Sequence, residues 1–247
     1  GSTRNRSTTL ALIKFANFLF ESSDDCMNFL RVLFIDFSKA FDIIDHTVLC
    51  KKLIDGKFPP HIVAWSLSFL QDRFQYVKVG NLLSSPCVVN AGAPQGTRAG
   101  PDDFRLIIND LLFSLPCVKY VDDVTVASVS RDSSDNRLQE AVDYLMHWCT
   151  DNGMRLNIAK TKEMIVHFGR RELSNAVPML SIRASNVERV TTFKLLGVFF
   201  SSDLSWSAHI SYILKKSAKR LYVVYQLVRA GINTRDIVSV YCSLIRS

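Results

Sequence analysis

The stretch Lys119-Tyr120-Val121-Asp122-Asp123-Val124-Thr125-Val126 places two adjacent aspartates between two runs of apolar, β-prone residues. This pattern predicts a strand, a tight turn and a second strand. Two-residue hairpin turns favour Asn-Gly or Asp-Gly, because their central residues need positive φ, and this stretch contains no glycine. An isolated Asp-Asp pair is most simply a solvent-exposed acidic turn, whereas strain and repulsion at a hairpin tip are typical of a functional site. The choice depends on partners elsewhere in the chain.

A third carboxylate lies in the apolar run Val32-Leu33-Phe34-Ile35-Asp36-Phe37. Such a continuous run predicts a strand that is buried on both faces. A buried carboxylate is costly unless a cation pairs with it or a metal binds it, and the run itself holds no cation. Together with Asp122 and Asp123 on a neighbouring strand, Asp36 would form an all-oxygen site suited to Mg²⁺. Two such ions stabilise the attacking and leaving oxygens of phosphoryl transfer.

Three motifs follow one another along the chain: Phe34-Ile-Asp-Phe-Ser-Lys-Ala-Phe-Asp42, Gly92-Ala-Pro-Gln-Gly96 and Tyr120-Val-Asp-Asp123. Each motif is weak evidence alone. In this order and at these intervals, they resemble those of a reverse transcriptase. The longer phrases Phe37-Ser-Lys-Ala-Phe-Asp-Ile-Ile-Asp-His46 and Ile108-Asn-Asp-Leu111 resemble the non-LTR, LINE-type retrotransposon branch.

The resemblance implies an RNA-directed DNA polymerase that extends a primer with dNTPs in retrotransposition. Its fold would be α+β, a polymerase palm with a small antiparallel sheet backed by helices on one face, and a C-terminal helical segment. Residues 1–29 would be a remnant of the fingers, residues 30–205 the palm, and residues 206–247 the start of a basic helical thumb. The palm region would include a fingers hairpin near 73–90 and a primer-grip hairpin near 189–200. Short strands separated by amphipathic helices also favour α+β over a parallel sheet.

The resemblance carries specific roles onto residues of this chain. Asp36, Asp122 and Asp123 would be the catalytic residues and would hold two Mg²⁺ ions, which Mn²⁺ can replace, with the Val121 carbonyl as a further ligand. The nucleotide-binding residues would be Phe37, Phe41, Gln95, Gly96, Lys160 and Lys162. Phe41 would be the aromatic gate that excludes a 2′-hydroxyl, although its spacing alone predicts a core residue. One of the two lysines would act on the triphosphate or pyrophosphate, although surface lysines are common.

Asp102 and Asp103 fall where the family often has paired apolar residues. They are expected in the first turn of a helix that starts near Pro101, where acids favour the helix dipole. A structural role is therefore expected for them rather than a fourth metal ligand.

Primer and template contacts are implied at Tyr120, Leu196, Gly197, Lys215, Lys216, Lys219 and Arg220. The net charge of the chain is +7, and residues 209–247 carry +6 of it. A basic surplus fits nucleic acid or an anionic membrane. The resemblance favours an RNA template, a DNA primer and their hybrid. The apolar pattern that ends the second C-terminal helix predicts some self-association through a truncated thumb.

Composition excludes several other classes of protein. The 247 residues are 48% hydrophobic, enough for a sizeable core. The six cysteines form no C-x-x-C pair, so most of them are expected to be reduced core residues and a zinc site is not expected. No apolar run reaches the length of a membrane span. We therefore expect a nuclear or cytoplasmic protein that is not secreted and does not bind membranes.

Two other functions fit the same residues. One is a non-catalytic or domesticated palm fragment that binds nucleic acid without polymerising, because most of the fingers and thumb are expected to lie outside this chain. The other is a palm-type nucleotide cyclase or a two-metal nuclease. The Gly92–Gly96 motif and the primer-grip-like hairpin disfavour the cyclase and the nuclease, which need neither.

Overall fold

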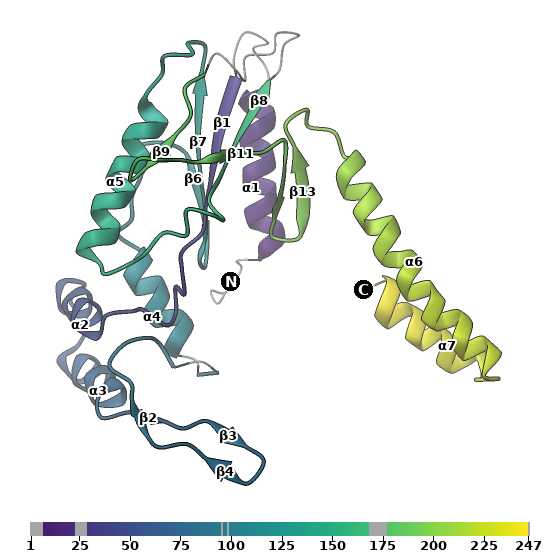
Figure 1. Ribbon diagram of the computed structural model, residues 1–247, viewed down its shortest axis with the longest axis horizontal. Helices are drawn as coiled ribbons and strands as arrows, with labels where there is room; N and C mark the ends of the chain where they lie inside the picture. The colour runs from purple at the N-terminus through teal and green to yellow at the C-terminus, as the bar shows by residue number, and fades with distance from the viewer. Residues whose placement is uncertain (1–6, 23–28, 95, 98, 168–176, 247) are drawn as a thin grey trace. The chain divides into compact units, whose positions relative to one another are not determined.

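The computed structural model describes residues 7–22, 29–94, 96–97, 99–167 and 177–246. The chain forms two compact units, Gly1–Val190 and Thr191–Ser247 (Figure 1). The fold is a mixture of helices and small sheets, in agreement with the expected α+β class. The expected division into fingers remnant, palm and thumb stays a prediction.

The first unit is built on a five-stranded sheet in the order β11-β8-β1-β7-β6 (Figure 1). Its strands are β1 (Phe29–Ile35), β6 (Cys117–Tyr120), β7 (Asp123–Ser130), β8 (Lys162–His167) and β11 (Glu188–Arg189). The pairs β1–β7, β1–β8 and β6–β7 are antiparallel, as expected. The pair β11–β8 is parallel, so the expectation of a purely antiparallel sheet is wrong at this edge. The long connection between β8 and β11 allows the chain to return in the same direction.

Strand β1 is buried along its whole length, which confirms the prediction for residues 32–35, but the expected buried carboxylate is not found, because Asp36 follows the strand and its side chain is 37% exposed. Leu33 and Ile35 share a core with Leu145 of helix α5 (Arg137–Asp151). Side chains alternate between the faces of a strand, so Phe34 points to the other side. There it meets Phe15 of helix α1 (Thr8–Glu21), with ring centroids 6.1 Å apart. Helices therefore pack on both faces around β1, and the expectation of helices on one face only is wrong.

Three helices and a hairpin complete the first unit: α2 (His46–Asp55), α3 (Pro60–Leu70) and α4 (Ala99–Ile108), with β2 (Phe74–Gln75), β3 (Lys78–Val79), β4 (Leu82–Leu83) and β5 (Cys87–Val88). Asp45 caps α2 by accepting hydrogen bonds from the N–H groups of Thr47 and Val48. The hairpin expected near 73–90 forms through the pairs β2–β5 and β3–β4. Residues 74–88 are exposed throughout, because no described element packs on these short ladders.

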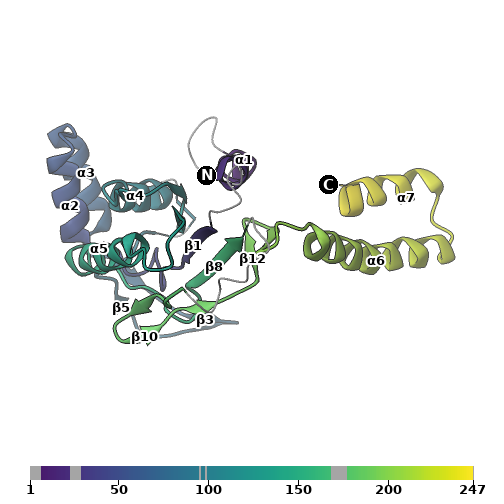
Figure 2. The same cartoon turned by 90° about the horizontal axis from the view of Figure 1, so that it is seen from above.

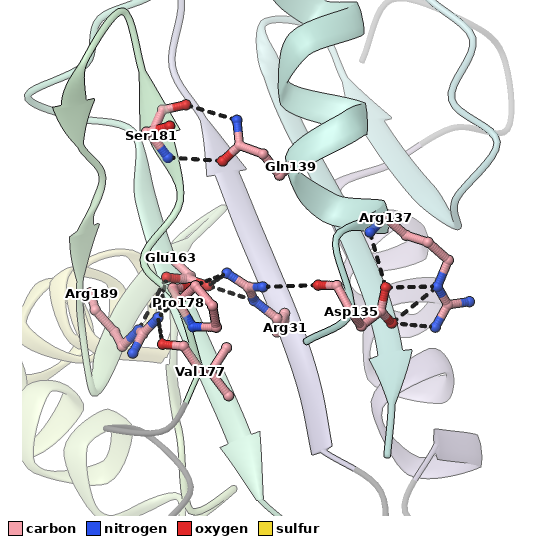
Figure 3. Close-up of polar contacts among 9 residues, drawn as sticks. All are labelled: Arg31, Asp135, Arg137, Gln139, Glu163, Val177, Pro178, Ser181 and Arg189. Atoms are coloured by element: carbon pink, nitrogen blue, oxygen red, sulfur yellow. Dashed lines mark hydrogen bonds and ion pairs between the residues drawn. The ribbon is translucent and has the colours of Figure 1, made fainter. Parts of the chain in front are cut away.

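A short hairpin of β9 (Ser181–Ile182) and β10 (Ser185–Asn186) precedes β11. Its backbone is bound by a side chain of α5, where Gln139 accepts a hydrogen bond from the N–H of Ser181 at 2.9 Å and donates one to the Ser181 carbonyl at 3.0 Å (Figure 3). The β9–β10 hairpin therefore lies on the α5 side of the sheet.

The second unit contains a hairpin and two helices: β12 (Thr192–Leu195), β13 (Val198–Ser201), α6 (Ser207–Arg229) and α7 (Thr234–Tyr241), which continues as the π-helical turn η2 (Cys242–Arg246). Helices α6 and α7 lie side by side (Figure 2). No residue of α6 or α7 is buried within the described chain. Their apolar side chains are therefore available to a partner, and self-association stays a prediction. Among the described residues, no helix is long and apolar enough to cross a membrane.

The described cysteines are all free thiols. Cys149 is buried, but Cys87, Cys117 and Cys242 are exposed, so the expectation that most cysteines are core residues is wrong. Cys87 lies on the exposed hairpin and Cys242 on the π-helical turn, where neighbouring apolar residues are exposed as well.

A buried ionic network ties the β8–β11 edge to the centre of the sheet (Figure 3). Arg31 of β1 donates to Glu163 of β8 at 2.8 Å, and Arg189 of β11 donates to the other carboxylate oxygen at 3.0 Å. The guanidinium of Arg31 also donates to the carbonyl of Pro178 at 2.8 Å. The side chains of Arg31 and Glu163 are only 3% and 0% exposed. One fully buried carboxylate thus serves two arginines.

Replacing Glu163 tests this network. Glu163→Gln keeps the shape but removes the buried carboxylate charge that Arg31 and Arg189 share, so we expect a loss of about 3–5 kcal/mol in the free energy of unfolding. The matched control is Glu188→Gln, which breaks the ion pair of a 67% exposed carboxylate with Lys162 and should cost no more than about 1 kcal/mol. Urea denaturation of both variants measures the difference. Equal losses would show that the buried network adds no stability.

Candidate active site

The acidic hairpin joins β6 to β7, and its tip differs by one residue from the expected tip. Tyr120 pairs with Asp123, so the two turn residues are Val121 and Asp122 rather than the two aspartates. The predicted positive φ is present, but at Val121, whose φ is 56°. A β-branched residue in this region costs about 1–3 kcal/mol. The side chain of Val121 packs against the main core, which holds it in this conformation.

Asp36 follows directly after β1 and lies beside this hairpin. Ile35 is paired with Val124, so the next position along β1 is level with Asp123. The backbone of Asp36 is held on its other side, because its carbonyl accepts the N–H of Asn157 at 2.8 Å and its N–H donates to the hydroxyl of Thr161 at 3.4 Å. The fold therefore brings Asp36 to the Asp122–Asp123 turn, as the sequence predicts.

The three carboxylates act on one another electrostatically. The pKa of Asp123 is raised to about 6, chiefly by burial, then by the negative charge of Asp122 and then by that of Asp36. Negative charge is thus concentrated at one end of the β1–β7 pair. An arrangement of this kind favours a bound cation, which would lower the pKa of the carboxyl groups again.

The ligand types of this arrangement suit a divalent cation, but the spacing of the described side chains does not form a complete metal site. Carboxylates and a free carbonyl are the ligands that Mg²⁺ prefers. Within the described part of the chain, however, no group of three or more His, Cys, Asp or Glu side chains is close enough to hold a metal ion. The Mg²⁺ ions and the Val121 carbonyl ligand therefore stay predictions.

The structure distinguishes between the two candidate lysines. The ammonium group of Lys160 lies 3.9 Å from the carboxylate of Asp36, and its side chain is 71% exposed. The ammonium group of Lys162 instead donates to the carbonyl of Ala159 and pairs with Glu188. Lys160 is therefore the lysine whose exposed side chain lies near the carboxylates, whereas the side chain of Lys162 is held by Glu188 at the sheet edge.

The glycine-rich motif lies against the segment that follows Asp36. The N–H of Ala93 donates to the carbonyl of Phe41 at 2.7 Å, and the N–H of Gly92 donates to that of Ile44 at 2.8 Å. A Cβ on Gly92 would lie 2.8 Å from the carbonyl oxygen of Asp42, so only glycine fits. The candidate gate residue, Phe41, is thereby fixed next to the glycine-rich motif.

The candidate nucleotide-binding aromatic residues have different surroundings. Phe41 is partly exposed and packs on Phe104 of α4, with centroids 4.8 Å apart. Phe37 is 5% exposed and packs on Trp148 of α5, so its side chain belongs to the core, and its expected nucleotide contact stays a prediction. Alternation along the chain explains this, because Asp36 and Phe37 point to opposite sides. Gly96 has a φ of 79°. Gln95 lies outside the described residues.

Two structural contacts near the site were not predicted. Lys119, next to the acidic hairpin, donates to the carbonyls of Ile108 at 3.2 Å and Leu111 at 2.9 Å, and so holds the C-terminal end of α4. Asp110 accepts a hydrogen bond from the indole of Trp148 at 3.0 Å and pairs with Lys52 at 2.5 Å. Asp110 lies in the Ile108–Leu111 phrase that carried the resemblance, and Lys119 directly precedes the Tyr120–Asp123 motif. That was the only signal in the sequence, and it did not reveal their partners.

The primer and template candidates lie on several elements. Tyr120 is half-buried in β6 beside the acidic tip. In the second unit, Leu196 and Gly197 form a two-residue turn with φ of 47° and 93°, the positive values that tight hairpins need. Lys215, Lys216 and Lys219 are exposed on α6.

Arg220 has a structural contact instead, since its guanidinium donates to the carbonyl of Leu244 in η2. His209 accepts the N–H of Phe199 at 3.4 Å, which agrees with a structural role at the start of α6.

Comparison with known proteins now identifies the family. The profile described as reverse transcriptase (RNA-dependent DNA polymerase) matches residues 14–200. The chain belongs to the reverse transcriptase family. The match covers β1, the glycine-rich motif and the acidic hairpin, which are the parts that form the candidate site.

Similar proteins come from mobile elements of insects. The chain is 28% identical over 192 residues to an RNA-directed DNA polymerase from mobile element jockey of Drosophila melanogaster, covering 73% of this chain and 20% of that protein. It is 26% identical over 252 residues to a probable RNA-directed DNA polymerase from transposon BS of the same species, covering 96% and 26%.

A third relative is a retrovirus-related Pol polyprotein from type-1 retrotransposable element R1 of Bradysia coprophila. It is 24% identical over 197 residues, covering 77% of this chain and 19% of that protein. These relatives confirm the predicted non-LTR branch of reverse transcriptases. The chain spans about a fifth to a quarter of their length.

The acidic start of α4 in this reverse transcriptase gives a pH-dependent prediction. The pKa of Asp103 is raised to about 6 by burial and by Asp102, against a smaller opposite effect of His46. The folded state thus holds this proton more tightly than the unfolded chain, and the associated stability is lost as pH rises from about 4 through about 6. Asp103→Asn should therefore raise the melting temperature at pH 7.5 and give no gain at pH 4.

The control for this prediction is Asp132→Asn, which should behave in the opposite way. Hydrogen bonds from Ser134 lower the pKa of Asp132, so its contribution is present above the ordinary pKa and is lost as pH falls. This variant should lower the melting temperature at pH 7.5. Thermal melts of both variants across pH measure the two effects, and the same pH trend in both would contradict the sign assigned to Asp103.

Proposed function

We propose that this chain forms the palm-centred catalytic core of an RNA-directed DNA polymerase that acts in non-LTR retrotransposition. It would extend a DNA primer with dNTPs on an RNA template, in the nucleus or cytoplasm. The observation that carries the proposal is the placement of Asp36 beside the Asp122–Asp123 turn in a chain of this family. Three carboxylates at one end of a buried strand pair have no evident structural purpose, since their negative charges repel one another.

The carboxylates would be the metal-binding part of the site. Asp36, Asp122 and Asp123 would hold Mg²⁺, which supplies the positive charge that activates a primer 3′-hydroxyl and neutralises departing pyrophosphate. The contacts of the Asp36 backbone with Asn157 and Thr161 fix the position of this residue before any ligand arrives. The core contact of Val121 does the same for the hairpin tip. Such orientation in advance is the main way in which a protein accelerates phosphoryl transfer.

The residues around the carboxylates would position the nucleotide. Lys160 is an exposed cation 3.9 Å from the carboxylate of Asp36, so we assign to it the contact with the triphosphate. Phe41, held by the Ala93 hydrogen bond and by Phe104, would be the sugar-contacting gate. The positive φ of Gly96 presents a bare backbone at the end of the same loop, where a nucleotide or template base could approach closely.

The second unit would bind the nucleic-acid backbone. Three lysines lie within about one turn of helix α6: Lys215, Lys216 and Lys219. Their charges therefore share one side of an exposed helix. Such contacts depend on salt and carry no sequence information. The pairing of template and incoming nucleotide would supply the sequence choice.

One observation favours the non-catalytic alternative. Within the described residues, no group of carboxylates is arranged tightly enough for a metal ion. A palm that binds nucleic acid without polymerising would not need one. The two functions differ in a single measurable outcome, which is extension of a primer.

The first test is primer extension on an RNA template with Mg²⁺ or Mn²⁺. We expect extension by the parent chain and a loss of more than about a hundredfold in Asp122→Ala/Asp123→Ala, because the charges that hold the metal are gone. Asp151→Ala, an exposed carboxylate at the end of α5, is the control and should extend normally. Full activity without Asp122 and Asp123 would refute the assigned site. Inactivity of the parent as well would favour the non-catalytic alternative.

The second test compares the two lysines. Lys160→Gln should raise the KM for dNTP by roughly tenfold, the effect of losing one charged contact with phosphate. Lys162→Gln should change KM much less, because its ammonium group is already paired with Glu188. Steady-state kinetics at several dNTP concentrations separate the two. A larger effect at Lys162 would reverse the assignment.

A further inference from the structure

A pocket of about 350 Å³ lies on the α5 side of the sheet, behind the segment that follows Asp36. Its walls come from four places in the sequence: the 38–43 segment, α5, the 155–158 loop and the β9–β10 turn. Three of the lining side chains are basic, and these are Lys39, Arg155 and Arg183. Such a volume is at the lower end of the range for small-molecule sites.

The three cations of this pocket are not used by the fold. Lys39, Arg155 and Arg183 are exposed, and within the described residues none of their side chains makes a hydrogen bond or an ion pair. Each comes from a different element, so their approach is not a run of charge along one helix. Lys39 and Arg183 are both fixed in left-handed backbone conformations, each with a φ of 49°. Like charges gathered in this way repel one another unless an anion joins them.

The rest of the lining is apolar. Ile43, Met146, Leu156, Ile158 and Ile182 make up most of it, and the hydroxyl of Ser38 adds a polar group. An apolar wall beside a cationic rim suits a ligand with a flat, weakly polar body and a strongly anionic group. Arginine binds phosphate, like carboxylate, through two parallel hydrogen bonds, and three cations in one pocket suit the multiple negative charge that a phosphate group carries.

This pocket is separate from the candidate active site but shares segments with it. Phe37 points toward α5, on the pocket side, whereas Asp36 points away. The N–H of Ser38 donates to the carbonyl of Arg155 at 2.8 Å, and the N–H of Asn157 donates to the carbonyl of Asp36 at 2.8 Å. A ligand bound between Lys39 and Arg155 would therefore touch the two segments that fix the backbone of Asp36.

We propose that this pocket binds the phosphate group of a nucleoside phosphate, with Lys39, Arg155 and Arg183 as its cationic contacts. Its phosphate could also be that of free pyrophosphate, which carries the same charged group without a base. The proposal does not depend on polymerase activity, because the pocket lies on the other side of the strand from the carboxylates.

Methyl NMR of the methionines tests the pocket directly. The probe is dATP, added in EDTA to the Asp122→Asn/Asp123→Asn chain, so that metal-dependent binding at the candidate active site is removed. The methyl signal of Met146, which lines the pocket, should shift and saturate, while that of Met164, 0% exposed inside the sheet, should stay in place. No saturable shift of Met146 would overturn the proposal.

Variants and other ligands identify the contacts. Arg155→Ser/Arg183→Ser should weaken dATP binding by at least about tenfold, whereas Lys14→Ser/Lys51→Ser, which removes the same charge from exposed sites, should not. Lys39→Gln should weaken binding as well and serves if the arginine variant does not fold, as judged by circular dichroism. Unchanged affinity in these variants would overturn the assignment.

Ligand comparisons decide the source of the phosphate. Binding of pyrophosphate as tight as that of dATP would support a phosphate site and name pyrophosphate as its ligand. Weaker binding of pyrophosphate would support a nucleotide. Equal binding of adenosine and dATP, or binding of an RNA oligomer without any binding of dATP, would overturn the proposal, because neither depends on the phosphate of a small molecule.

Discussion

The register between β1 and β7 is the constraint on which the candidate site depends. Ile35 opposite Val124 sets Asp36 level with Asp123, at the open end of the strand pair. A slip by one residue would turn every side chain of β1 to the other face, and would bury Asp36 beside Trp148 in place of Phe37. The apolar packing of β1 on both α1 and α5 prevents such a slip. The packing that buries β1 therefore also fixes the position of the carboxylates.

The other neighbour of β1 fixes the remaining approach to the site. Strand β8 pairs with β1 along six positions, and the loop before it carries Asn157, Lys160 and Thr161, all of which touch Asp36. The Arg31–Glu163–Arg189 network holds β8 and β11 against β1 further along the sheet (Figure 3). The position of Lys160 beside the carboxylate is thus set partly by charges that lie deep in the sheet and never meet a substrate.

Local features were predictable from sequence, because neighbouring residues decide them. The cap at Asp45, the helix start at Pro60, the Leu196–Gly197 turn and the amphipathic α5 all follow from short-range chemistry. Features that depend on distant partners were missed. Spacing could not show that Lys162 is held by Glu188, or that Phe37 faces α5. The tip of the acidic hairpin was misplaced by one residue, because the pairing of Tyr120 with Asp123 is a tertiary choice between two plausible turns. The family resemblance predicted the site residues, and the structure then distinguished those that lie near the carboxylates from those that make structural contacts.

The charge at one end of β1 is neutralised by its neighbours, whereas the charge at the other end is not, and this difference marks the site. At one end, Arg31 is 3% exposed and its guanidinium is satisfied by a carboxylate and by backbone carbonyls. At the other end, within the described residues, the only ion-pair partner of Asp36 is the exposed Lys160 at 3.9 Å, while Asp36 and Asp122 both add negative charge beside Asp123. A fold that can neutralise a buried charge completely at one end of a strand has no packing reason to leave negative charges uncompensated at the other. Uncompensated charge in a rigid setting is the property that a binding partner of opposite sign requires, and it arises here from the same strand that stabilises the sheet.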